Sequence, residues 1–114
     1  MRVLLCIVVL VTLSLPSEPA NAQASYWVYK RINRTYEAIN AEDYAEALKQ
    51  LAELKRIKGL KPYDEALMWH AYGHVFFMQE RFPEAAKAME AALALDALEA
   101  HKINEMHFNL GQLY

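Results

Sequence analysis

Two histidines spaced by four residues come closest, in type and spacing, to a chemical site in this sequence. A helix would present His70 and His74 on one face, and that spacing can hold a zinc ion. The zinc metalloprotease motif, however, requires a glutamate directly after its first histidine, where this sequence has Ala71. His101 and His107 would join the pair only if another helix brought them close. Because spacing fixes no third ligand, we predict neither a metal nor a cofactor; a metal-binding or enzymatic accessory domain built on this pair is the alternative.

The rest of the sequence gives catalysis little support. It contains no nucleophile elbow, no phosphate-binding loop and no paired carboxylates in a recognisable setting. The formal net charge is −2 at pH 7, whereas a nucleic-acid-binding surface needs an excess of basic residues. We therefore predict that the chain is not an enzyme and does not bind nucleic acid.

The first 22 residues have the order of a secretory signal peptide. Arg2 supplies a positive start, Val3–Leu15 is an apolar run, and cleavage is predicted after Ala22, with Ala24 as the second choice. An uncleaved membrane anchor is the alternative, but the run is shorter than the roughly 20 residues that span a bilayer. We expect a periplasmic or secreted protein without stable membrane insertion after cleavage.

Residues 23–114 have the composition of an all-α domain. Many alanines and few β-branched residues follow residue 22, which favours helices over sheets. The only cysteine, Cys6, precedes this region, so its core must hold together without disulfides. Gly59 suits a helix end, and Pro62 and Pro83 suit helix starts. The sequence predicts antiparallel hairpins built from about five helices, near residues 26–41, 43–57, 62–79, 83–95 and 98–114.

An internal repeat underlies this pattern. The segment at 44–47 (YAEA) returns at 82–85 (FPEA), and we call the distance between them along the chain the repeat interval. Leu51 returns as Met89 after the same interval. A second, independent set also obeys it: Trp69, Tyr72, Gly73 and Phe76 recur as His107, Leu110, Gly111 and Tyr114. Internal repetition at an interval of this size is typical of stacked helical repeats.

Residues 66–97 resemble one tetratricopeptide repeat. In that family, the first helix carries a bulky, a large, a small and an aromatic residue, and the second carries an alanine, a large residue and another alanine. The matching residues here are Trp69, Tyr72, Gly73, Phe76, Ala85, Met89 and Ala92. The resemblance implies a short α-solenoid of stacked hairpins, with a degenerate first repeat at 28–58 and the start of a third at 104–114. A plain helical bundle is the alternative.

Residues 60–114 are also similar to exported bacterial repeat proteins described as components of the TonB energy-transduction system. In these proteins too, an "ALALDAL" segment is followed by an "NLGQLY" helix. This resemblance implies a periplasmic scaffold whose partner is another protein or peptide, such as a component of envelope transport. The sequence stops at Tyr114, on a repeat signature position, which predicts a truncated chain; the alternative is that the last helix is the solvating cap. A purely structural segment of a longer solenoid is a further alternative for the whole chain.

The family resemblance also implies a concave groove that contacts a ligand. His70, His74 and Phe77 would line it from one helix. The register of the repeat adds residues from the first and last helices: Tyr29, Ile32, Tyr36, Ile39, Phe108 and Gln112. Such a groove is aromatic and apolar, which predicts an extended or helical peptide with hydrophobic anchors as the ligand. The alternative is that several of these side chains pack against the next helix.

Four basic residues cluster near the end of the second predicted helix: Lys55, Arg56, Lys58 and Lys61. A solvated helix end is the favoured interpretation. A contact with anionic lipid headgroups or with an acidic partner is the alternative.

Overall fold

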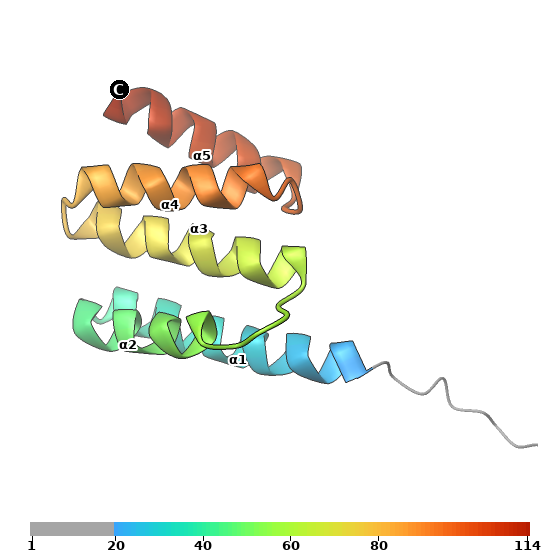
Figure 1. Ribbon diagram of the computed structural model, residues 1–114. Coiled ribbons are helices and arrows are strands. Elements are labelled where there is room, and N and C mark those ends of the chain that lie inside the picture. Colours follow the sequence, from blue (N-terminus) through green and yellow to red (C-terminus); the bar gives the residue numbers. More distant parts are fainter. Residues whose placement is uncertain (1–19) are drawn as a thin grey trace, which may run out of the picture.

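Within the residues described, the chain folds into five α-helices and contains no β-strand. The computed structural model describes the backbone of residues 20–114 and the side chains from residue 25 onward. In chain order the helices are α1 (Ala20–Asn40), α2 (Tyr44–Lys55), α3 (Pro62–Met78), α4 (Phe82–Ala94) and α5 (Ala100–Leu113) (Figure 1). The prediction of an all-α chain with five helices is confirmed. The predicted signal peptide lies mainly on residues 1–19, outside the described part, and Ala22 and Ala24 fall in the first turns of α1.

The helices begin and end where local chemistry favours it. Asp43 caps α2 by accepting a hydrogen bond from the backbone N–H of Glu46 at 3.1 Å. Pro62 occupies the first turn of α3, and Gly59 adopts a positive φ of 75° in the loop before it. The predicted boundaries are right to within two residues except at the start of α1, which begins at Ala20 instead of residue 26. Three alanines between Ala20 and Ala24 explain this earlier start, because alanine is the strongest helix former.

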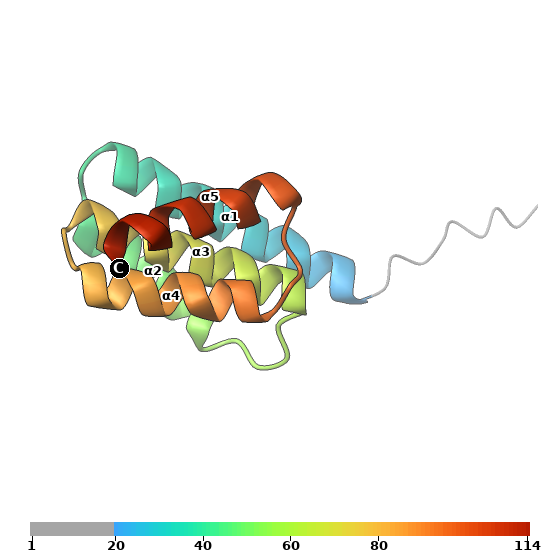
Figure 2. The ribbon, with the colours of Figure 1, turned by 90° about the horizontal axis from the view of Figure 1, so that it is seen from above.

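The helices pair in sequence order. α1 packs on α2 and α3 packs on α4, each pair joined by a short turn, and α3 also contacts both helices of the first pair. The last helix, α5, packs along α4 (Figures 1 and 2). At its end, the Tyr114 hydroxyl donates a hydrogen bond to Glu90 of α4. Among the helices described, none is long and apolar enough to cross a membrane.

The turns inside the two hairpins share one geometry and are separated by the repeat interval. Glu42 and Glu80 both adopt left-handed conformations, with φ of 59° and 58°. In the first turn the N–H groups of Glu42 and Asp43 donate to the carbonyls of Ile39 and Ala38 at 2.9 and 2.8 Å. The same pairs of bonds recur in the second turn, where residues 80 and 81 donate to residues 77 and 76. This is the hydrogen-bond pattern of a Schellman motif, which satisfies the last carbonyls of a helix.

The residues that match the repeat signature lie at the contact between helices. Five of them are buried, namely Tyr72, Gly73, Ala85, Met89 and Ala92, whereas Trp69 and Phe76 are half-buried. A Cβ atom added to Gly73 would lie 3.0 Å from Cγ of Met89 and 3.7 Å from the carbonyl oxygen of Ala85. The small residue therefore allows α3 and α4 to approach closely at this crossing.

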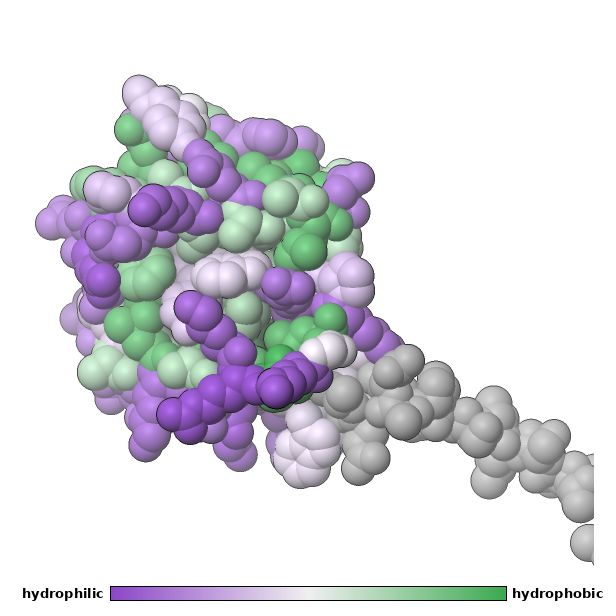
Figure 3. All heavy atoms as spheres, viewed as in Figure 1, coloured by the Kyte–Doolittle hydropathy of each residue, from purple (hydrophilic) through white to green (hydrophobic). Residues whose placement is uncertain are grey.

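Two apolar clusters form the core. The first joins α1, α2 and α3 and includes the fully buried Leu51 and Leu54. The second joins α3, α4 and α5, and α5 contributes the fully buried Met106 together with Leu110. On the face drawn in Figure 3, hydrophilic and hydrophobic residues are interspersed, so no broad apolar area covers that side.

Candidate functional site

A cavity of about 540 Å³ lies between α1 and α3, and we call it the tyrosine groove. Four tyrosines border it, two of them one helical turn apart on α1. The polar residues that join them come from α1, from the first turn of α3 and from α5. The lining is Ser25, Tyr26, Tyr29, Ile32, Asn33, Tyr36, Tyr63, Asp64, Leu67 and Lys102.

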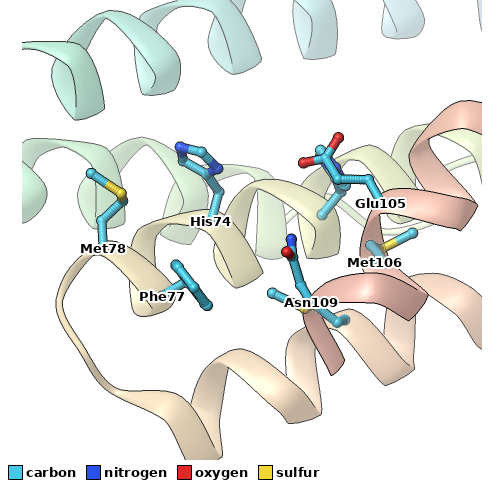
Figure 4. Close-up of a pocket in the computed structure, with 8 residues that line it drawn as sticks. His74, Phe77, Met78, Glu105, Met106 and Asn109 are labelled. Atoms are coloured by element: carbon cyan, nitrogen blue, oxygen red, sulfur yellow. The ribbon is translucent and has the colours of Figure 1, made fainter. Parts of the chain in front are cut away.

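A smaller cavity of about 150 Å³ lies between α3 and α5. Figure 4 shows Glu105 and Asn109 pointing from α5 toward His74 and Phe77 on α3. Its complete lining is His70, His74, Phe77, Met78, Met89, Glu105, Met106 and Asn109. The two cavities therefore open along the same row of helices, α1, α3 and α5.

A polar contact between α1 and α3 separates the two cavities. The hydroxyl of Tyr36 lies 3.0 Å from Nδ1 of His70, within hydrogen-bond distance. The Tyr36 ring also makes an edge-on contact with His74, with ring centroids 5.8 Å apart. Tyr36 lines the tyrosine groove and both histidines line the smaller cavity, so these three half-buried side chains form a wall common to both.

Burial determines the protonation of this wall. Loss of solvent, together with the nearby carboxylate of Glu105, raises the pKa of Tyr36 to about 12. Burial also lowers the pKa of His70, while Glu105 opposes that shift and Lys102 and His74 add to it. Near neutral pH, Tyr36 therefore keeps its hydroxyl proton and His70 is a neutral imidazole. Which of the two groups donates in the hydrogen bond between them depends on the tautomer of the imidazole.

Asp64 is the most deeply buried charged group of the tyrosine groove, with only 4% of its surface exposed. The hydroxyl of Ser25 donates a hydrogen bond to its Oδ2 atom at 3.0 Å. Asp64 itself belongs to the lining of the groove. Its position in the first turn of α3 also stabilises its charge through the helix dipole.

The structure brings together most of the predicted groove residues but divides them. Tyr29, Ile32 and Tyr36 line the tyrosine groove, with Ile32 buried in its floor. The three predicted residues of α3 line the smaller cavity: His70, His74 and Phe77. Phe108 lines neither cavity and is 66% exposed on α5, and Gln112 is likewise exposed. The assignment of Ile39 to the groove is wrong, because this residue is buried in the core between α1 and its neighbours.

Several lining residues were missed by the sequence reasoning. Tyr63 and Leu67 precede His70 by seven and three residues, so the helical period alone would have found them. Asp64 carried no such signal, because an acidic residue in the first turn of a helix is ordinarily solvated. The contributions of α5, namely Lys102, Glu105 and Asn109, depend on how that helix is set against α3.

The histidine pair gains no further ligand from the fold. Among the described residues, no group of three or more histidine, cysteine, aspartate and glutamate side chains is placed to hold a metal ion. Nδ1 of His70 already faces the Tyr36 hydroxyl. The arrangement of His70 and His74 suits hydrogen bonding and packing at a binding surface better than coordination of a metal ion.

Titration of His70 is expected to make the fold less stable in mild acid. Burial lowers the pKa of His70 in the folded state, so the unfolded chain takes up a proton first as the pH falls below about 6.5. The free energy of unfolding therefore decreases as the pH falls from about 6.5 to the pKa of His70 in the folded state. Replacing His70→Gln should flatten the dependence of the free energy of unfolding on pH between about pH 7 and pH 5, as measured by urea unfolding. The matched variant of an exposed histidine, His101→Gln, is the control for the substitution itself. Equal slopes for wild type and His70→Gln would contradict this linkage.

Comparison of the chain with protein-family models, with curated proteins and with solved structures finds no significant match.

Proposed function

We propose that this chain is an exported scaffold of the tetratricopeptide type, and that it binds a segment of another protein in the tyrosine groove. Two hairpins whose turns share one geometry at the repeat interval support the assignment to a repeat family. So does the close approach of α3 and α4 at Gly73, where the repeat signature requires a small residue. The order of residues 1–22 supports export, and the similarity of residues 60–114 to proteins of the TonB system supports a partner in envelope transport.

The observation that carries the proposal is the groove itself. Its volume of about 540 Å³ falls within the roughly 300–1,000 Å³ of small-molecule pockets, which leaves room for side chains of a peptide. Three of its tyrosines keep large exposed fractions, 55% for Tyr26, 61% for Tyr29 and 40% for Tyr63. Tyrosine is enriched at binding surfaces because its ring offers apolar area and its hydroxyl a hydrogen bond.

The charges around the groove favour a basic group in the ligand. The buried Asp64 lines the cavity, and tyrosine faces attract cations. Glu105, which lines the smaller cavity, adds a negative charge near Tyr36 and His70. Lys102, the only basic residue among the described residues that line the groove, already lies 3.5 Å from Glu99. A peptide segment with one lysine or arginine among hydrophobic anchors therefore fits this site best.

Selection from a library of random peptides displayed on phage tests the proposal. The wild-type chain should select peptides with aromatic or aliphatic anchors and a basic residue. Replacing Tyr29→Ala should weaken binding of a selected peptide on the order of tenfold in fluorescence anisotropy. Trp27→Ala is the matched control, because Trp27 is a similarly exposed aromatic residue of α1 that lines a different cavity. Asp64→Asn should remove the preference for basic peptides while retaining the apolar anchors.

Two outcomes would overturn the assignment. If the wild-type chain selects no peptide, the groove has no peptide ligand and the chain is better explained as a structural segment of a longer solenoid. If Tyr29→Ala binds as well as Trp27→Ala, the ligand binds elsewhere. Circular dichroism of each variant shows whether a loss of binding reflects a loss of helix.

A further inference from the structure

Basic residues of the chain gather on one surface, which we call the basic surface. On α1 they follow Trp27 with the spacing of a single helical face, as Lys30, Arg31 and Arg34. These four residues and Ile57, from the loop after α2, line a common cavity of about 180 Å³. Ile57 thus joins the α1 face to the cluster at the end of α2, which consists of Lys55, Arg56, Lys58 and Lys61. Seven of the 12 lysine and arginine residues of the chain belong to this surface.

Most of these charges are not neutralised within the described part of the chain. Among the described residues, only Arg56 of this surface has a carboxylate within salt-bridge distance, that of Glu53 at 3.8 Å. Arg31 donates instead to the side-chain amide of Gln50, and Lys30 lies 5.4 Å from the ring centres of Tyr26 and Trp27. Figure 3 shows hydrophilic residues gathered over the C-terminal end of α2. Like charges held together repel one another, and a solvated surface alone does not require them to share one sign.

Two apolar side chains stand exposed among these charges. Trp27 is 56% exposed and Ile57 is 42% exposed. The equivalent face of α3, one repeat interval later, is buried, since Met68 and Tyr72 pack there against the first hairpin. On α1 that face carries Lys30 and Arg34 instead. A tryptophan and an isoleucine surrounded by lysine and arginine are typical of membrane-docking surfaces. In such surfaces the apolar groups insert among the lipid headgroups and the cations contact anionic lipid.

We propose that the basic surface docks on a bilayer that contains anionic phospholipid, with Trp27 and Ile57 inserted at the headgroup level. A bilayer fits better than an acidic protein because the cations are long side chains spread over α1, the end of α2 and the loop after it. Among the described residues of this surface, only Arg56 has a carboxylate partner, and this arrangement suits a diffuse layer of negative charge. Trp27 and Tyr29 lie on different cavities of α1, so lipid docking leaves the tyrosine groove accessible. The proposal does not depend on the nature of the groove's ligand.

Sedimentation of the full chain with phosphatidylglycerol–phosphatidylcholine vesicles tests this docking. We expect binding that increases with phosphatidylglycerol content and falls steeply between about 0.05 and 0.5 M salt. Arg34→Gln combined with Lys58→Gln should weaken binding by about 25-fold, roughly fivefold for each charge. The matched control, Lys49→Gln with Lys87→Gln, removes the same charge from exposed residues outside the basic surface and should change binding less than about threefold. All variants retain the same N-terminal residues, so any affinity of those residues for lipid cancels.

Tryptophan fluorescence reports the insertion directly. In a Trp69→Phe background Trp27 is the only tryptophan, and its emission should shift to shorter wavelength with anionic vesicles but not with pure phosphatidylcholine.

Equal losses of vesicle binding from the two pairs of substitutions would overturn the proposal in favour of a net-charge effect. If polyglutamate abolishes vesicle binding and by itself shifts the Trp27 emission, the ligand of the basic surface is an acidic protein. If inorganic phosphate competes with vesicles at matched ionic strength, the ligand is a free anion. If anionic vesicles do not shift the Trp27 emission, the proposal of lipid docking is refuted.

Discussion

Replacing Leu51 by alanine is expected to lower the free energy of unfolding by about 3 kcal/mol. Leu51 has no exposed surface and lies in the apolar cluster that α1, α2 and α3 share. Removing its side chain loses the transfer free energy of the methyl and methylene groups and leaves a cavity that the helices on either side cannot fully close. Because domains of this size are stabilised by only about 5–15 kcal/mol, this single change should be evident in urea or thermal unfolding.

Leu48 provides the matched control for that substitution. It lies one turn earlier on α2 and is only partly buried at the edge of the same cluster. Leu48→Ala should therefore cost clearly less than Leu51→Ala, since its removed groups are already partly in water. If the two variants unfold at the same urea concentration, α2 does not pack between α1 and α3 with Leu51 inward.

Replacing Gly73 by leucine is expected to destabilise the chain by about 1–3 kcal/mol, although leucine is a better helix former than glycine. The new Cβ atom would lie 3.0 Å from Cγ of Met89, and the rest of the side chain would have to separate α3 from α4. Gly111 is the equivalent residue one repeat interval later, and a Cβ atom there meets no described atom within 4 Å. Gly111→Leu should therefore be neutral, or stabilising by up to about 1 kcal/mol through helix propensity.

The opposite signs expected for these two glycines make the test specific. Thermal unfolding measured by circular dichroism would compare both variants with the wild type. Adding Met89→Ala to Gly73→Leu should recover part of the lost stability, because the smaller residue makes room for the larger one. Equal effects of Gly73→Leu and Gly111→Leu would show that α3 and α4 do not cross closely at Gly73.

The two proposed binding activities involve different surfaces of α1. Tyr29 and Tyr36 face the tyrosine groove, whereas Trp27, Lys30 and Arg34 belong to the basic surface. A scaffold docked on lipid through the second surface would hold its groove beside the membrane. Substitutions on each surface are expected to affect one binding activity and leave the other intact.

Local chemistry made much of the helical framework predictable. Alanine content, together with breaks at Gly59, Pro62 and Pro83, was sufficient for five helices in the right order. The start of α1 was missed because the alanines after Pro19 were assigned to a cleavage site, although they also favour helix. Burial of Tyr72 and Met89 followed from the period of apolar residues, since one face of each helix must be removed from water.

The sequence by itself determined that this chain is helical, where its helices break, and which residues meet inside a hairpin, because these properties depend on residues close together along the chain. Only the tertiary structure decided that Tyr63, Asp64 and Tyr36 border one cavity and that Ile57 lies beside Trp27 and Arg34. It also decided that Phe108 stands apart from both cavities. These relations depend on the angle and rotation between helices, which result from the packing of many side chains at once and leave no signal in local spacing.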